Sequence, residues 1–384
     1  MTRTGSLVAE AAAIAGAVAG PAADDVDRES RFPKEAIDAL REASLLSAMI
    51  PARFGGREAT LSEVGAVVAA LARSCASTAM IFAMHQIQVA CLVRHSHTPF
   101  FDDYLRDEVV GRQALLASAT TEVGIGGDVR RSTCAVESAN GRIHLRKHAP
   151  VISFGHNADA VLVTARRRPD SASSDQVLVL CRRPGLRLEP ASEWNALGMR
   201  GTCSRGYVLE SDDVEDCVLP DSFADISSHT MLPTSHLLWG HVWLGIAQQA
   251  ASHAHTLVRA EARKAVGSMP PSAIRLAELR STLLTLESVV SLATRRYDAQ
   301  ELHGEQLGSL AFAIDANCVK VAASTLVVDI VSRAMRICGM AGYLEDSEHR
   351  LGRLLRDAHS AELMVGNDRI LASTAQLLLA ARDQ

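Results

Sequence analysis

Three stretches of the chain carry residues whose types and spacing suit chemistry. Residues 121–128 read Thr-Glu-Val-Gly-Ile-Gly-Gly-Asp. These glycines would let the backbone lie close to a bound ligand, while the Thr121 hydroxyl bonds its edge. A second stretch contains His236 and His241, whose ordinary pKa suits proton uptake near neutral pH. A third contains Glu362, a possible general base. The alternatives are a plain hairpin loop, two helix-interface histidines and a solvated or salt-bridged carboxylate.

The elements that must position these residues follow the order helices, strands, helices. Residues 1–115 have apolar residues at helical spacing. Residues 116–228 contain short runs rich in β-branched residues, separated by turn residues, which predict a compact β-domain. Residues 229–384 return to helical patterns, which predict a helical bundle. Its expected helices cover 237–262, 273–302, 310–335 and 351–381. We therefore expect an α+β protein that is mainly α.

Composition and charge exclude several classes of protein. The 384 residues are 48% hydrophobic with a formal net charge of −5, so the chain can form two or three domains and has no basic stripe for nucleic acid. Eight cysteines include no C-x-x-C pair and no zinc spacing, so we expect buried free thiols, no metal and a cytoplasmic location. The apolar run 7–19 is too short to cross a bilayer, so no membrane association is expected.

Five motifs with defined spacing run through the chain. They are Pro51-x-x-Phe-Gly-Gly56, Thr121-Glu-Val-Gly-Ile-Gly-Gly-Asp128, Trp194-Asn-Ala-Leu-Gly-Met-Arg-Gly-Thr202, Ile337-Cys-Gly-Met-Ala-Gly-Tyr343 and Arg356-Asp-Ala358. In this order they resemble motifs of the acyl-CoA dehydrogenase superfamily, and the resemblance covers nearly the whole chain. It implies an N-terminal helical domain (1–115), a middle β-barrel-like domain (116–228) and a C-terminal four-helix bundle (229–384).

The resemblance also implies a flavin, FAD in the first place and FMN as the alternative. It places Thr121 and Gly126 at the flavin ring and Ser153 beside the reactive nitrogen of the flavin. Arg263 falls where a family arginine reaches a pyrophosphate, commonly on a neighbouring subunit, and a guanidinium suits that anion. Gly339 would lie near the nucleotide half of the cofactor, and Arg369 stands where the family often has glutamine.

The catalytic carboxylate of the family is missing from both of its usual positions. The first position, just before the glycine that follows Arg-Asp-Ala, holds Val365, which cannot take a proton. The second lies ten residues before the glycine of a Gly-x-x-Gln run, and it holds Ser235. The substitutes within reach are Glu362, one helical turn before Val365, and His236 and His241 on the other helix.

Three functions fit these observations. The chain could oxidise an acyl thioester, carried by CoA or a carrier protein, with a relocated base. It could instead be a monooxygenase that uses reduced flavin and O2, since oxygen chemistry needs no such base. It could also be a non-redox flavoprotein. The long C-terminal helices carry more apolar surface than one chain covers, so we expect a homo-oligomer, a dimer or a tetramer. An electron-transfer or flavin reductase partner is a further expectation.

Overall fold

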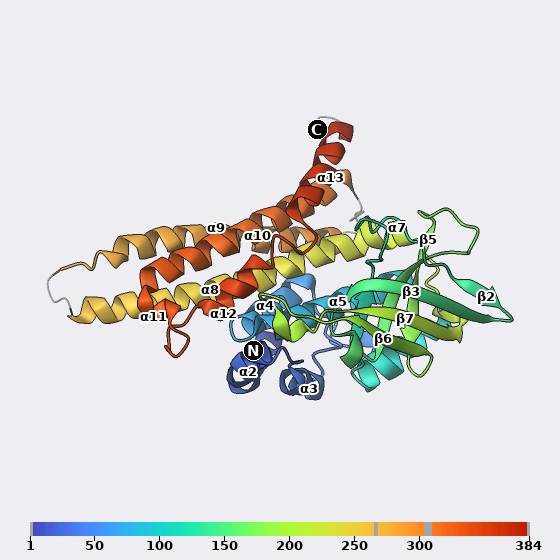
Figure 1. Cartoon of the computed structure of the whole chain (residues 1–384), viewed down its shortest axis with the longest axis horizontal. Helices are drawn as coiled ribbons and strands as arrows, with labels where there is room; N and C mark the ends of the chain where they lie inside the picture. The colour runs from blue at the N-terminus through green and yellow to red at the C-terminus, as the bar shows by residue number, and fades with distance from the viewer. Residues whose placement is uncertain (1–2, 265–267, 303–308, 382–384) are drawn as a thin grey trace.

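The chain folds as helices, then strands, then helices (Figure 1). This computed structural model describes residues 3–264, 268–302 and 309–381. The N-terminal helices are α1 (Arg3–Ile14), α2 (Gly20–Arg28), α3 (Lys34–Glu42), α4 (Leu61–Ala72), α5 (Ala76–His95) and α6 (Pro99–Tyr104). A capping box fixes the start of α4, because Thr60 Oγ1 accepts from the Glu63 amide and Glu63 accepts from the Thr60 amide. Helix α5 is buried along most of its length, which makes it a core helix.

The strands form two sheets between residues 116 and 214. One sheet pairs β1 (Leu116–Ala119) in parallel with β4 (Ala160–Arg166), which pairs antiparallel with β5 (Gln176–Arg182). The other is antiparallel in the order β2-β3-β7-β6. Its strands are β2 (Glu137–Ala139), β3 (Arg142–Ile152), β6 (Leu186–Ser192) and β7 (Arg205–Val214). The first sheet is buried on both faces, as its continuous apolar runs predict.

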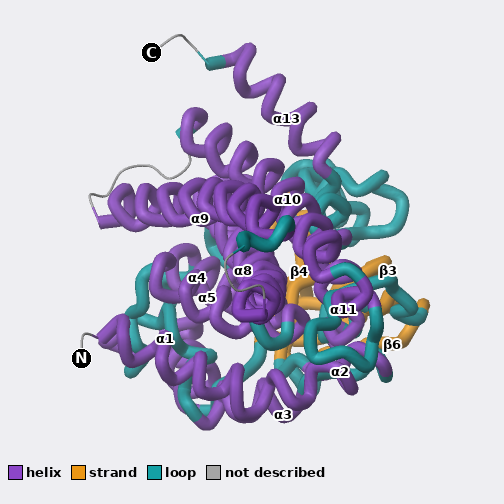
Figure 2. Tube along the Cα trace, turned by 90° about the vertical axis from the view of Figure 1, so that its left-hand side faces the viewer, coloured by secondary structure: helices purple, strands orange, loops and turns teal. Residues whose placement is uncertain are grey.

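Three long helices run side by side and extend past the rest of the chain (Figure 1). They are α8 (Leu232–Lys264), α9 (Ser272–Leu302) and α10 (Leu310–Cys338). Seen end-on, α8 lies in the middle, between the N-terminal helices and α9 and α10 (Figure 2). The short α7 (Phe223–Ile226) and the π-helical turn η7 (Ser227–Met231) lead into α8. The first half of α8 is buried all round, because it contacts helices on several sides.

The fourth expected helix is not continuous, which corrects the sequence-based expectation for 351–381. Helix α12 (Gly352–His359) ends in a turn, and α13 (Asn367–Ala380) begins only after Gly366. Val365 has a φ of 49° in that turn, a left-handed conformation that a β-branched residue rarely adopts. Helix α13 then leaves the body of the molecule (Figure 1). The apolar spacing of 351–381 gave no sign of this break.

Three helical stretches are long and apolar enough to cross a bilayer by length and composition alone. They are 7–28, α5 and α10, and the most apolar window of each is 28%, 89% and 44% buried inside the protein. The burial of α5 explains its composition, since a core helix is apolar on every side. Helix α10, by contrast, is only partly covered within the described part of this chain.

Candidate active site

A cavity of about 580 Å³ lies where the two helical regions meet the sheets. One face of α5 lines it with Met80, Met84, Ile87 and Gln88, at helical spacing. Helix α8 adds Ser235, His236 and Trp239, and the turn after α12 adds Leu363, Met364 and Val365. The strand region adds Thr121, Val151, Ser153, Trp194 and Thr202. Thr121 and Ser153, which the resemblance places at the flavin ring, therefore line the same cavity as both positions of the missing carboxylate.

The turn within residues 194–202 joins the cavity wall to two helices. Met199, in the left-handed region with a φ of 51°, donates its amide to Asp357 Oδ1 at 2.6 Å. Its carbonyl accepts from Trp194 Nε1 at 3.2 Å, and Arg200 Nε donates to the Asp27 carbonyl at 2.7 Å. A Cβ on Gly198 would lie 2.2 Å from the Arg356 carbonyl oxygen, so only glycine fits there. The motif therefore fixes α2 and α12 against the cavity.

Buried Asp357 makes the stability of this joint, the contact between the 194–202 turn and α12, depend on pH. Burial raises the pKa of Asp357 to about 6, well above its ordinary value, although Arg353 and the Met199 amide oppose the shift. The contribution of Asp357 to the free energy of unfolding is therefore complete below about pH 4 and is lost as the pH rises through about 6.

We expect Asp357→Asn to gain stability over the wild type as the pH rises from 4 to 7. The variant stays neutral and keeps an acceptor for the Met199 amide. Its free energy of unfolding should rise relative to the wild type by roughly 2–3 kcal/mol over this range. Urea unfolding of both proteins across the range measures the difference. A difference that stays constant with pH would contradict this account of the joint.

Hydroxyl groups line the cavity on the sheet side. Ser153 Oγ lies 2.8 Å from Ser204 Oγ, which lies 2.8 Å from Thr202 Oγ1. Thr121 Oγ1 donates to the Val151 carbonyl at 3.3 Å, across the same wall. Hydroxyls can both donate and accept, so this row can bond the polar edge of a ring system. The structure thus brings Thr121 and Ser153 together, as the resemblance implies.

Glu122 anchors the loop that begins at Thr121. Its carboxylate accepts from the Ser132 hydroxyl at 2.7 Å and the Cys134 amide at 2.7 Å, and also from Thr133. Lys147 Nζ lies 3.6 Å away and is fully buried. Burial alone would raise the pKa of Glu122, but these hydrogen bonds and Lys147 hold it below its usual value. Glu122 therefore positions the loop and does not itself line the cavity.

Arg369 reaches the same glycine loop from α13. Its guanidinium donates to the Gly126 carbonyl at 2.8 Å and also to the Gly127 carbonyl. Gly127 has a φ of 77°, and because it has no side chain it leaves room for the arginine. Gly126 and Arg369 thus meet each other, next to the cavity wall at Thr121.

Two cofactor candidates lie at the opposite end of the long helices. At 1.5 Å per residue, Arg263 is about 40 Å along α8 from His236. Gly339 ends α10 with a φ of 54° and leads into α11 (Met340–Tyr343), which lies near the C-terminal end of α8 (Figure 1). The six candidates therefore form two groups at the two ends of the helices. One chain cannot bring both groups to a single flavin.

Two of the three substitute bases do not reach the cavity. His241 is enclosed between α4 and α9, where a Cβ on Gly65 would lie 2.4 Å from its Nε2 and Thr294 Oγ1 bonds it at 3.1 Å. Glu362 is exposed on the outer side of the turn and accepts from Thr325 Oγ1 at 3.3 Å. Because the helix is broken between α12 and α13, Glu362 lies away from the cavity. Helical spacing alone does not predict this.

His236 does line the cavity, but its environment does not suit a base. It is 3% exposed, and burial, with a smaller effect of Lys320, lowers the pKa of His236 to about 3. Its ring is hydrogen-bonded to the Ala316 backbone, which leaves Nδ1 as the nitrogen without a partner in the described chain. Ser235 donates its hydroxyl to the Met231 carbonyl at 2.5 Å. His236 therefore stays neutral near pH 7.

Two residues near the turn were not predicted from the sequence. His359 lines the cavity directly after the Arg-Asp-Ala motif. Its position one helical turn from Arg356 is the sequence pattern that could have predicted this. Lys320 is buried behind the turn and donates to the Val365 carbonyl at 3.0 Å and to Asn367 Oδ1 at 2.7 Å. Burial lowers the pKa of Lys320 to about 8. These bonds hold Val365 in its left-handed conformation.

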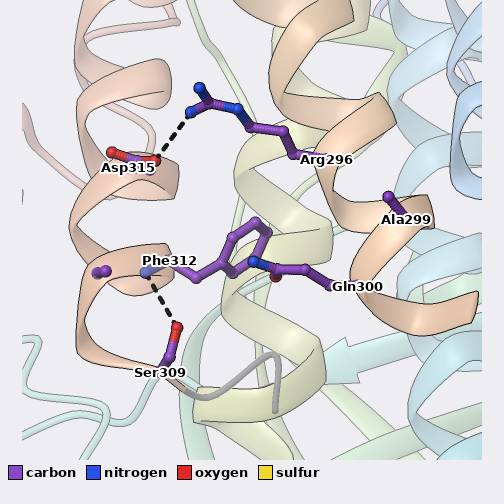
Figure 3. A pocket seen from close by; sticks show the side chains of 7 residues that line it. Arg296, Ala299, Gln300, Ser309, Phe312 and Asp315 are labelled. Carbon is purple, nitrogen blue, oxygen red and sulfur yellow. Dashed lines mark hydrogen bonds and ion pairs between the residues drawn. The ribbon is translucent and has the colours of Figure 1, made fainter. Parts of the chain in front are cut away.

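A second, smaller pocket of about 350 Å³ lies between α9 and α10 (Figure 3). Arg296 and Asp315 form a 3.3 Å ion pair across it, and Ser309 caps α10 by accepting from the Phe312 amide at 3.3 Å. The ion pair links the two helices, and the Ser309 bond lies within the start of α10. The pocket is consequently a feature of packing, and the chemistry belongs to the larger cavity.

The helical–β–helical order and this cavity define a class of protein, and comparison with known families agrees. The acyl-CoA dehydrogenase N-terminal domain matches residues 4–106, and the acyl-CoA dehydrogenase C-terminal domain matches residues 229–376. The chain belongs to the acyl-CoA dehydrogenase superfamily, whose members are flavin-dependent oxidoreductases, and it has the fold that the sequence predicts.

Relatives and solved structures include two kinds of enzyme. The chain is 23% identical to cyclohex-1-ene-1-carbonyl-CoA dehydrogenase of Geobacter metallireducens, over 91% of this chain and 90% of that protein. It is 28% identical to the probable FMNH2-dependent monooxygenase SfnC of Pseudomonas putida, over 86% and 85%.

The same division appears among structures. FMN-bound TdsC from Paenibacillus sp. A11-2 superimposes with a TM-score of 0.84 at 20% identity, over 98% of both chains. Butyryl-CoA dehydrogenase from Megasphaera elsdenii superimposes with a TM-score of 0.83 at 20% identity, over 99% of this chain and 98% of that one. At these identities the structures support the fold alone.

Proposed function

We propose that this protein is a flavin-dependent monooxygenase that uses reduced flavin and O2 on an apolar substrate. One observation carries the proposal: no aspartate or glutamate lines the cavity along 3–264, 268–302 and 309–381. A dehydrogenase of this family needs a carboxylate base next to the thioester, and Val365 and Ser235 occupy its two known positions. Since neither Glu362 nor His241 lines the cavity and His236 is a weak base, none of the three substitutes replaces that carboxylate.

The residues on the sheet side fit the ring of a flavin. Thr121, Ser153 and Ser204 would bond its polar edge, and Trp194 would contact its face. When bound, reduced flavin supplies two electrons to O2, so that one oxygen atom enters the substrate and the other leaves as water. FMN and FAD carry the same ring, so this end of the site fits either.

The rest of the wall is largely apolar. Methionine and other apolar side chains from α5, η7, α8 and the 363–365 turn line the space beside these hydroxyls; they include Met80, Met84, Met231, Leu232 and Met364. An apolar wall limits the contact of a reactive oxygen species with water and favours an apolar substrate. The likeness to SfnC supports this proposal, while the likeness to cyclohex-1-ene-1-carbonyl-CoA dehydrogenase leaves the thioester alternative to experiment.

Oxygen uptake with a reducing system tests the proposal. The protein is mixed with FMN or FAD, NADH and a general flavin reductase, and O2 uptake and H2O2 release are followed over a panel of apolar substrates. We expect some substrates to lower the H2O2 released per O2 consumed, because oxygen then enters the substrate. If H2O2 accounts for all the O2 with every substrate of the panel, and thioesters reduce the flavin instead, the proposal is wrong.

We further propose that the protein works as a homo-oligomer, a dimer or a tetramer. Apolar side chains on the described outer faces support this, among them Ile274, Leu284 and Leu292 on α9 and Leu371, Leu378 and Leu379 on α13. The separation of Arg263 and Gly339 from the cavity also favours a second copy that supplies the far end of FAD.

If FAD bridges two copies, Arg263→Ala should weaken FAD binding by about 10–100-fold, the effect of losing a charged hydrogen bond. FMN binding should not change. Arg259→Ala, one turn earlier on the same exposed side of α8, is the matched control. Titration calorimetry gives the affinities and light scattering the oligomeric state. An unchanged FAD affinity in Arg263→Ala, or a monomer at micromolar concentration, would count against the shared site.

A further inference from the structure

Methionine is concentrated around the large cavity. The chain has ten methionines, and five of them line this one space: Met80, Met84, Met199, Met231 and Met364. Leucine is much commoner in the sequence, yet only three leucines line the cavity. A thioether sulfur is soft and polarizable, and unlike a hydrocarbon it can take up one oxygen atom to become a sulfoxide. The wall therefore contains groups that oxygen chemistry in the cavity can modify.

Two of the five methionines have accessible surface in the cavity. Met84 is half-buried, whereas every other residue of α5 from 76 to 92 is buried. Since its neighbours along the helix are covered, the accessible part of Met84 is the part that lines the cavity. Met364 is also half-buried, in a turn whose residues 363–365 all line the same space. These two thioethers are open to whatever the cavity holds.

The same space would hold the ring of the flavin. Thr121 and Ser153, which fit the polar edge of that ring, line the cavity together with Met84. A bound substrate would lie between the ring and the apolar wall. Without a substrate, the accessible thioethers of the wall take its place, and no cysteine lines the cavity in the described chain to compete with them.

We propose that Met84 and Met364 are modification sites, which the protein oxidises to sulfoxides when it turns over without substrate. This inference rests on the proposed function, because the oxidant is O2 activated by reduced flavin. One oxygen atom bonds to the sulfur, the O–O bond breaks, and the other atom leaves as water with two protons. O2 receives two electrons from the sulfur and two from the reduced flavin. Each sulfoxide adds a polar group to the apolar wall, which weakens the binding of an apolar substrate.

Mass spectrometry of peptides after turnover tests the proposal. The protein is incubated with FMN, NADH, a flavin reductase and O2, without substrate, and with catalase to destroy H2O2 that leaves the cavity. We expect Met84 and Met364 to gain one oxygen atom each. Met269 and Met340, which are 67% and 64% exposed, should gain several-fold less. Met80, which is 1% exposed, should stay unmodified.

Two controls show that the oxidation occurs in the cavity. With H2O2 added in place of the reducing system and catalase, the order should reverse, because Met269 and Met340 meet bulk solvent first. In the wild type, substrate-free turnover should lower the affinity for an apolar substrate several-fold. In the double variant Met84→Leu with Met364→Leu, the affinity measured before and after such turnover should be the same.

The inference is overturned if Met84 and Met364 stay unmodified in the presence of catalase, or if Met269 and Met340 are modified as much. Oxygen uptake reports on the proposed function separately. Coupling of O2 to an added substrate, with no sulfoxide at Met84 or Met364, overturns only the inference. Recovery of all the O2 as H2O2 with every substrate, again without sulfoxide, overturns the proposed function as well.

Discussion

Glu122→Ala is expected to lower the free energy of unfolding by about 3–5 kcal/mol, the usual effect of leaving one partner of a buried ion pair alone. Among the described residues, the substitution leaves the buried Lys147 ammonium with Thr164 as its remaining acceptor, at 2.6 Å from the Thr164 carbonyl and 2.9 Å from its hydroxyl. It also removes the acceptor of the Cys134 amide and one of the two acceptors near the Ser132 hydroxyl. Urea unfolding followed by circular dichroism measures the loss.

A double variant separates the charge from the packing. Glu122→Leu with Lys147→Met replaces the buried pair by apolar groups of similar size, which in other proteins is often neutral or stabilising. We expect it to recover most of the stability but not flavin affinity, because the hydrogen bonds that shape the loop after Thr121 are lost. If Glu122→Ala unfolds at the same urea concentration as the wild type, the loop is not anchored as described.

Val365→Glu is expected to give the protein an activity that the wild type lacks, reduction of flavin by acyl thioesters. Position 365 lines the cavity and is 47% exposed, so a carboxylate there remains hydrated and ionised. Lys320 holds the backbone at this position through the Val365 carbonyl, and that bond does not depend on the side chain. A positioned general base contributes on the order of 10²–10⁴ in rate, which sets the expected gain over the wild-type background.

Val365→Gln is the matched control, since it has the size of glutamate without its basicity. Stopped-flow absorbance with a panel of acyl-CoA substrates measures flavin reduction in all three proteins. If Val365→Glu binds flavin and thioester but reduces no flavin, the 365 turn does not point a side chain at the reacting carbon, and the assignment of this position is wrong.

Much of the fold followed from spacing and motifs. The helical, β and helical order and the long helices α8, α9 and α10 appear close to the expected ranges, because their apolar periodicity is long and regular. The β-branched runs 151–153, 160–164, 177–180 and 207–209 overlap β3, β4, β5 and β7, whereas β1, β2 and β6 contain no such run and were not predicted. The break at 360–366 was missed because tertiary bonds from Lys320 to Val365 and Asn367 impose it, and no local residue pattern encodes those bonds.

The candidate site was predicted in part, for a similar reason. Thr121 and Ser153 lie on one wall because short strands and turns of the β-region position both. His241 and His236 are five residues apart on one helix, and their spacing cannot tell which of them faces the cavity and which faces Thr294.

Anaerobic mixing of the flavin-loaded wild-type protein with acyl-CoA thioesters tests the central claim most directly. The claim is that the cavity, as lined by the described residues, lacks the carboxylate base for thioester oxidation. We predict that the visible absorbance of the oxidised flavin stays unchanged with every thioester in the panel, while Val365→Glu loses it with at least one. Bleaching of the wild-type flavin by any of these thioesters within seconds would contradict the account and identify the protein as an acyl thioester dehydrogenase.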